Sequence, residues 1–236
     1  MSDTETTGFA QNHIVELASV IKMNNGDVYH WYSKCKPSSP IEDGAAQVHG
    51  ITNAMVANER QDIEAVAQWW KDVCDLQAQS KEAMVISGHN ISYDLRALRR
   101  YVTIPLNTLT LCTMKLGRKY NPESPNHKLV ELHNYLGLTG DYAAHSALDD
   151  VFMHENIVNY YVSKLGFTYQ ALARQQMQPT LLKIMPFGKH KGTEFAVLDS
   201  GYMEYMLRIQ DLDNDVRFSM ENELSTRANR TNRRAW

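Results

Sequence analysis

Short blocks of apolar and polar residues alternate along the first two thirds of the chain. A nearly continuous apolar run at residues 14–22 predicts a buried strand. The turn sequence Asn-Asn-Gly-Asp at 24–27 joins this run to a β-rich segment at 28–35, so a hairpin is expected. Apolar residues at helical spacing then fill 61–77, which predicts an amphipathic helix.

The pattern continues with alternating strands and helices. We expect two short strands, at 83–87 and 109–112, and three helices, at 93–98, 128–136 and 145–165. A hairpin with a third strand, followed by alternating helix and strand, is typical of the α/β class. The predicted architecture is a mixed β-sheet flanked by helices, with a small C-terminal extension.

The chain changes character near its C-terminal third. We divide it into a domain at 1–166 and a small module at 167–236, with a linker at 175–179. The first 165 residues hold 14 Lys and Arg against 19 Asp and Glu, whereas the rest hold 10 against 8, so the module is the more basic part. It is therefore a candidate nucleic-acid-binding element. The tail at 227–236 carries four arginines and no acid, and we expect it to be frayed.

Composition excludes several classes of protein. Hydrophobic residues make up 43% and charged residues 22%, near the globular average, so a disordered chain is excluded. No apolar run approaches the roughly 18–20 residues of a bilayer span, and the first residues lack a secretory signal. The three cysteines form no Cys-x-x-Cys pair, which argues against a disulfide framework or a zinc ribbon. We therefore expect a cytoplasmic protein without a membrane partner.

Acidic residues gather at three separated places along the chain. Asp3 and Glu5 lie two apart, and in a strand such residues point to the same face. Asp94 lies in the first turn of a helix that follows an apolar strand. Alternatively, the first two acids are a solvated pair near the N-terminus, and Asp94 only complements the helix dipole.

The third place is the start of the longest helical pattern. His145 lies five residues before Asp150, and Asp149 is the neighbour of that aspartate. Two aspartates are also ordinary favourable charges at a helix N-terminus, and a histidine there is often a surface residue. This cluster by itself therefore leaves both interpretations open.

The three acidic clusters together point to one chemistry. Each lies at a strand end or a helix start, and their oxygen ligands suit hard divalent cations such as Mg²⁺ and Mn²⁺. Two ions about 3.5–4 Å apart can bracket a phosphoryl group, one activating a water and the other stabilising the leaving 3′ oxygen. A neutral imidazole near that water would take its proton. We therefore expect phosphodiester hydrolysis with two Mg²⁺ ions as cofactor and Mn²⁺ as a substitute.

The same residues form three motifs in a fixed order. Asp-x-Glu-x-Thr-Gly, Asn-x-x-x-Asp and His-x-Ala-x-x-Asp resemble the motifs of the DnaQ-like DEDDh 3′→5′ exonucleases, and the resemblance covers residues 3–165. It implies a ribonuclease H-like fold with His145 as general base. The metal ligands that it implies are Asp3, Glu5, Asp94 and Asp150. Asp150 is preferred over Asp149 because it lies at the family spacing from the histidine.

The resemblance also assigns substrate contacts. Thr6 would help to seat the 3′-terminal nucleotide, and Asn90 would orient its turn. The family carries an apolar strand of several residues directly before its first aspartate, whereas only Met1 and Ser2 precede Asp3 here. Either the natural start lies upstream or the central strand is very short.

A subfamily signal follows in the C-terminal module. Met185–Gly192, followed by Asp199–Leu207, is similar to the C-terminal region of one subfamily of these exonucleases. Glycines flank the segment Lys-His-Lys, so a tight turn would present Lys189 and Lys191 to the phosphates of a substrate. The alternative is an ordinary basic hairpin tip.

The motifs together predict an enzyme that degrades nucleic acid. We expect a metal-dependent 3′→5′ exodeoxyribonuclease that releases nucleoside 5′-monophosphates from DNA 3′ ends, with single-stranded or frayed ends preferred. An exoribonuclease of the ribonuclease T or oligoribonuclease type is the first alternative, because the contacts that read the 2′-hydroxyl are not placed by the sequence. A non-catalytic nucleic-acid-binding module is the second, and the intact carboxylates and His145 argue against it.

Overall fold

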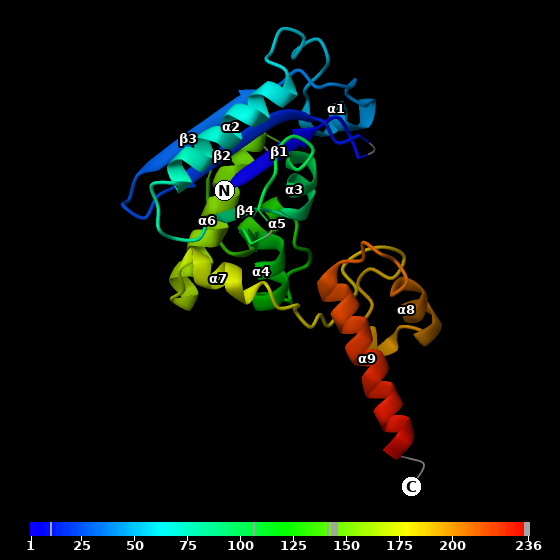
Figure 1. Cartoon of the computed structure of the whole chain (residues 1–236). Helices are drawn as coiled ribbons and strands as arrows, with labels where there is room; N and C mark the ends of the chain where they lie inside the picture. Colours follow the sequence, from blue (N-terminus) through cyan, green and yellow to red (C-terminus); the bar gives the residue numbers. More distant parts are fainter. Residues whose placement is uncertain (10, 106, 141, 143–145, 234–236) are drawn as a thin grey trace. The chain divides into compact units, whose positions relative to one another are not determined.

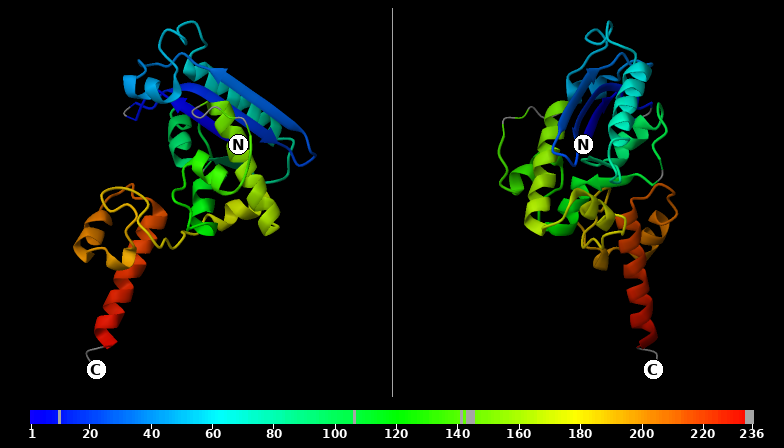
Figure 2. Two further views of the ribbon diagram at one scale, coloured as in Figure 1. Left: turned by 180° about the vertical axis from the view of Figure 1, so that it is seen from behind. Right: turned by 60° about the vertical axis from the view of Figure 1, so that its left-hand side comes forward.

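The chain folds into two units (Figures 1 and 2). The computed structural model describes residues 1–236 except 10, 106, 141, 143–145 and 234–236, and except the side chains of 231–233. The first unit comprises Met1–Met114 and Asn126–Gln175, and the second comprises Lys115–Pro125 and Gln176–Trp236. The nucleic-acid-binding role of the C-terminal module stays a prediction.

Three strands form an antiparallel sheet in the first unit. Their order is β1 (Ser2–Thr6), β2 (Ile14–Lys22), β3 (Val28–Lys34). β2 is the central strand and is buried through its first seven residues, as its apolar run predicts. Its register with β1 places Glu16 opposite Glu5 and Ala18 opposite Asp3, so these four side chains share one face of the sheet.

A second pair of strands runs parallel. It consists of β4 (Val85–Gly88) and β5 (Leu109–Cys112). β4 ends against the backbone of β1, because a Cβ atom added to Gly88 would lie 2.7 Å from the main-chain oxygen of Ser2. Glycine permits this close approach where a larger residue would force the strands apart. Antiparallel and parallel pairing within one unit confirms the expected α/β class.

Helices cover both faces of the antiparallel sheet, as the right-hand view of Figure 2 shows. The helices of the first unit are α1 (Asp43–His49), α2 (Asp62–Gln77), α3 (Ser92–Leu98), α5 (Leu129–Tyr135), α6 (Ala147–Leu165) and α7 (Tyr169–Gln175). On one face, the indole nitrogen of Trp69 in α2 donates a hydrogen bond to Ser19 Oγ over 2.8 Å. On the other face, Val151 of α6 packs with Ala18 and Val20. α6 therefore covers the face that carries Asp3 and Glu5.

A buried imidazole ties α6 to the parallel strands. His154 Nε2 lies 2.8 Å from Ser87 Oγ, and its Nδ1 lies 3.0 Å from the hydroxyl of Thr113, where α4 (Thr113–Tyr120) begins. Burial lowers the pKa of His154 well below its usual value, so the ring is neutral. A neutral imidazole between two hydroxyls satisfies all three groups, and it fixes α6 against the ends of β4 and β5.

The second unit has a small core of its own. A short 3-10 turn, Phe195–Val197, is followed by α8 (Ser200–Met206) and α9 (Asn214–Arg233). Three buried methionines, Met185, Met203 and Met220, stand at the centre of its apolar cluster. The flexible methionine side chain fills irregular gaps, which suits a core assembled mainly from loops and two helices.

The C-terminal tail differs from expectation. We expected fraying from residue 227, but α9 continues as a helix to Arg233. The guanidinium of Arg227 explains the order, since it donates to the main-chain oxygens of Phe195 and Ala196 over 3.2 and 3.0 Å and to Ser200 Oγ over 2.8 Å. Polar residues dominate α9, so its sequence has too little apolar periodicity to predict the helix.

The remaining elements agree closely with the apolar pattern. The hairpin, α2, α3, α5, α6, β4 and β5 are confirmed, with differences of a few residues at their ends. α1, α4 and α7 were not predicted. None of the residues of α1 is buried, so its sequence shows no apolar face. Among the helices that the structure describes, none has the length and hydropathy that crossing a bilayer requires.

Candidate active site

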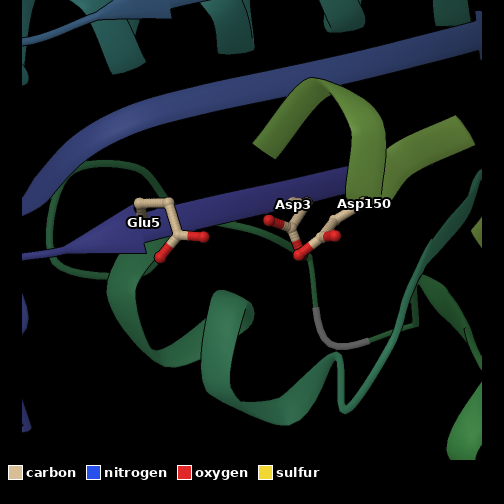
Figure 3. Close-up of side chains that lie close together, drawn as sticks. All are labelled: Asp3, Glu5 and Asp150. Atoms are coloured by element: carbon tan, nitrogen blue, oxygen red, sulfur yellow. The ribbon is translucent and has the colours of Figure 1, made fainter. Parts of the chain in front are cut away.

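β1 carries two carboxylates on one face. Asp3 and Glu5 are separated by one residue, so the strand's period of two points both side chains to the same side (Figure 3). Asp150, in the first turn of α6, reaches them from the helix that covers this face. One carboxylate oxygen from each of the three lies within 4.8 Å of those of the other two. The structure thus brings together residues that are far apart in the sequence.

The three carboxylates repel one another. Burial raises the pKa of Asp3 well above its usual range, and the charges of Asp94 and Asp150 add to the shift. Burial also raises the pKa of Glu5 to about 8, with the charges of Asp150 and Glu16 as the next causes. Several negative charges held together at low exposure cost free energy unless a cation compensates them. The arrangement therefore favours either bound protons or a bound cation.

Asp94 approaches the same region from α3. Its Oδ1 accepts two hydrogen bonds from Thr4, one from the backbone N–H over 3.0 Å and one from Oγ1 over 2.7 Å. Burial raises the pKa of Asp94 to about 7, against the hydrogen bonds from Thr4, which lower it. The group of oxygens within 4.8 Å of one another does not include Asp94. The structure therefore anchors this carboxylate to β1, beside the other three.

Glu16 is the acidic residue that sequence reasoning missed. It lies opposite Glu5 in the register of β1 and β2, is only 4% exposed, and contributes to the raised pKa values of Asp3 and Glu5. It belongs to none of the three motifs. One signal was available: Glu16 is the only acidic residue in a strand that is otherwise almost wholly apolar.

Two residues expected to contact the substrate lie in or just before the elements that carry these carboxylates. Thr6 ends β1, and its Oγ1 lies 2.6 Å from the hydroxyl of Tyr93, the residue before Asp94. Asn90 adopts a left-handed backbone conformation, with φ of 59°, in the turn between β4 and α3. Asparagine tolerates this conformation better than most residues, which fits the expectation that it orients the turn.

The remaining predicted site residues either lie away from the carboxylate cluster or fall outside the residues that the structure describes. His145 lies outside the residues that the structure describes, so its role as general base stays a prediction. Asp149 follows the helix start beside Asp150. Lys189 and Lys191 are exposed in the second unit, in a tight turn between two glycines with left-handed backbones. Their contact with substrate also stays a prediction.

The carboxylate cluster fits a divalent cation by its donor set. Mg²⁺ binds oxygen at about 2.0–2.1 Å in octahedral geometry, so two oxygens on one ion lie at most about 4.2 Å apart. The 4.8 Å limit that contains Asp3, Glu5 and Asp150 exceeds this span, and neighbouring ligands of an octahedral ion lie only about 3 Å apart, so the three side chains would draw together to bind one ion. Charge and geometry thus agree on a cation at this site.

Comparison with known proteins assigns the family. The exonuclease family model of the ribonuclease T type matches residues 1–158. This chain belongs to the exonuclease family. It is therefore an enzyme, a hydrolase that cleaves phosphodiester bonds from an end of a nucleic acid, and members of this family depend on a divalent metal. The matched residues include all the acidic residues described above and exclude the second unit's C-terminal part.

Individual relatives extend the similarity. Exodeoxyribonuclease 10 of Escherichia coli (strain K12) is 28% identical over 229 residues, which cover 94% of this chain and 96% of the relative. The PolC-type DNA polymerase III of Latilactobacillus sakei subsp. sakei (strain 23K) is 31% identical over 138 residues, but these cover only 9% of that protein. The first match confirms the subfamily signal, because it continues through the C-terminal module.

Solved structures agree with these matches. The structure of exonuclease X in complex with 5′ overhanging duplex DNA superposes with a TM-score of 0.58 at 28% identity and covers 73% of this chain and 96% of that one. Escherichia coli exonuclease I in complex with a dT13 oligonucleotide gives a TM-score of 0.59 at 16% identity, over 91% of this chain and 60% of that one. The second likeness shows the fold alone, and together they confirm the ribonuclease H-like architecture.

Proposed function

We propose that this exonuclease removes nucleoside 5′-monophosphates from the 3′ ends of DNA, preferentially from single-stranded or frayed ends, with Mg²⁺ as its natural cofactor. One observation carries the proposal. The chain matches exodeoxyribonuclease 10 over nearly the whole length of both proteins, and it keeps a cluster of carboxylates within reach of one cation. A shared cluster without the full-length match would support only the family.

The carboxylates would bind two cations with different sets of ligands. Asp3, Glu5 and Asp150 would share one ion, and Asp94, fixed by Thr4, would help to hold a second. Bound divalent cations would supply Lewis acidity to the attacking water and to the leaving 3′ oxygen. The protein's own part is to hold the carboxylates in position around the scissile phosphate, and bound cations would keep them ionised although burial raises their pKa values. His145 would accept the proton of the attacking water, as its motif indicates.

The surface beside Glu5 suits the terminal nucleotide. The ring of Phe9 is 88% exposed and meets the ring of Tyr93 edge to face, with centroids 5.8 Å apart. Tyr93 is in turn held by the hydroxyl of Thr6. An exposed aromatic ring next to a phosphodiester-cleaving site offers a stacking surface to an unpaired base without reading its sequence. This favours single-stranded ends and low sequence specificity.

The second unit would contribute affinity. Lys189 and Lys191 project from a glycine-bounded turn, and phosphate contacts by exposed lysines are electrostatic and independent of sequence. Its larger segment, Gln176–Trp236, lies outside the matched family model, whereas the match to exodeoxyribonuclease 10 covers 94% of the chain and so extends into this segment. Its role in binding the substrate strand rests on this charge and on that match.

The substrate assignment is tested by direct comparison of nucleic acids. DNA and RNA oligonucleotides of one sequence are incubated with the enzyme and Mg²⁺, and products are identified against nucleoside 5′-monophosphate standards. The variant Asp3→Asn is the control for contaminating nucleases. We expect faster release of mononucleotides from DNA than from RNA. Faster release from RNA would support an exoribonuclease instead, and binding of both without release would support a non-catalytic module.

A further inference from the structure

Glu16 is a buried carboxylate with no assigned role. It is 4% exposed in the middle of an apolar strand, and its side chain shares a face with Asp3 and Glu5. A charged residue in such a place is costly unless its oxygens are satisfied by hydrogen bonds. Its charge also opposes the nearby carboxylates, so a neutral residue of the same size would be less costly there. This cost requires an explanation in terms of what Glu16 binds.

Both oxygens of Glu16 are engaged. Oε1 accepts a hydrogen bond from the hydroxyl of Tyr32 in β3 over 2.6 Å. Oε2 accepts one from the backbone N–H of Ala147 over 2.9 Å. Since both oxygens are occupied, and since the group of oxygens that meet within 4.8 Å does not include Glu16, the residue is not placed as a further metal ligand.

Ala147 is the first residue of α6, where a helix leaves backbone N–H groups without partners. A side chain at the preceding position usually caps them. Ser146 occupies that position with an extended backbone, but its side chain makes no capping hydrogen bond. Glu16, far away in the sequence, supplies the acceptor that the local sequence does not. The negative charge at this end also suits the helix dipole.

We propose that Glu16 is a positioning residue, which fixes the first turn of α6 on the sheet and thereby sets where Asp150 meets Asp3 and Glu5. The proposal rests on the proposed function, because it concerns the geometry of that site. Asp150 lies three residues after Ala147, less than one helical turn away. Glu16 is joined to Glu5 by the register of β1 and β2. One hydrogen bond therefore links the strand that carries two carboxylates to the helix that carries the third.

Two substitutions at Glu16 distinguish the effect of side-chain length from the effect of charge. Glu16→Gln keeps the length and an acceptor oxygen but removes the charge, whereas Glu16→Asp keeps the charge and shortens the side chain by one methylene. If the hydrogen bond to Ala147 is what matters, kcat with Mg²⁺ falls about 10–100-fold for Glu16→Asp, as for other residues that orient metal ligands. KM for the oligonucleotide changes little, and kcat of Glu16→Gln stays near the wild-type value. Tyr32→Phe, which leaves the bond to Ala147 intact, serves as the matched control and should also stay near wild type.

A second measurement needs no metal and no activity. Hydrogen exchange of the Ala147 amide is followed by NMR in EDTA. We expect faster exchange in Glu16→Asp than in the wild type, and wild-type exchange in Glu16→Gln and Tyr32→Phe. Slowed turnover in Glu16→Gln with normal turnover in Glu16→Asp would overturn the proposal, because charge would then be the determinant. Unchanged exchange in Glu16→Asp would overturn it as well. Absence of nuclease activity in the wild type would instead contradict the proposed function, while the exchange result would still test the anchor.

Discussion

Replacing Glu5 by glutamine should stabilise the metal-free protein while it removes activity. The carboxylate sits among other negative charges, and burial together with Asp150 and Glu16 raises its pKa from 4.5 to about 8. A group whose pKa is higher in the folded state binds more protons when folded. Stability is therefore lost as the pH rises through the window from 4.5 to about 8, and glutamine, which mimics the protonated acid, escapes this loss.

The size of the effect follows from the width of that window. A difference of one pKa unit between the folded and unfolded states corresponds to about 1.4 kcal/mol in the free energy of unfolding. At pH 7 the wild type is therefore destabilised by up to about 3 kcal/mol relative to Glu5→Gln. Near pH 4 the two proteins should be equally stable, since the acid is then protonated in both states. A gain in stability that grows with pH is thus the signature of carboxylate repulsion at the site.

Urea unfolding in EDTA at several pH values measures this difference. Trp31, Trp69 and Trp70 lie in the first unit, so their fluorescence reports on the domain that contains Glu5. Glu82→Gln, at an exposed position of the same unit, is the control for loss of one negative charge and should show no such trend. If Glu5→Gln is less stable than the wild type at pH 7, or if the difference does not grow with pH, the electrostatic account of the site is wrong.

Three further outcomes are expected. His145→Ala should lower kcat by about 10²–10⁴ with little change in KM, and an unchanged kcat in steady-state assays would show that another group takes the proton. The double variant Lys189→Glu, Lys191→Glu reverses both charges of the turn. It should weaken binding of single-stranded DNA and make the salt dependence of the affinity shallower in fluorescence anisotropy titrations. An unaltered salt dependence would show that the turn does not contact the phosphates. His154→Leu should destabilise the fold by about 1–3 kcal/mol, because the buried hydroxyl of Ser87 loses its partner while that of Thr113 keeps His89. An unaltered urea midpoint would contradict that network.

Strand and helix periodicity accounts for much of what the sequence predicts. The apolar run of β2 and the spacing within α2 and α6 are long enough to be unambiguous, and the period of two in β1 is by itself enough to place Asp3 and Glu5 on one face. α9 was missed because its order depends on Arg227, which binds distant main-chain oxygens that no local pattern reveals.

Long-range contacts explain what the sequence could not supply at the site. The hydrogen bonds from Thr4 to Asp94 join segments 90 residues apart, and the bond between Glu16 and Ala147 spans 131 residues. Motif spacing identifies residues with a shared chemistry, but it does not show which of them are satisfied by the backbone of another element. Glu16 gave only the signal of a charge within an apolar strand, which marks a buried polar contact without naming its partner.

Digestion of end-labelled DNA tests the central claim most directly. Single-stranded oligonucleotides labelled at the 3′ end or at the 5′ end are incubated with the enzyme in Mg²⁺ and, separately, in EDTA. The account predicts that the 3′ label is released at once as a mononucleotide, that the 5′-labelled strand shortens stepwise, and that EDTA abolishes both. Release of the 5′ label first, or digestion that continues undiminished in EDTA, would contradict a metal-dependent 3′→5′ exonuclease.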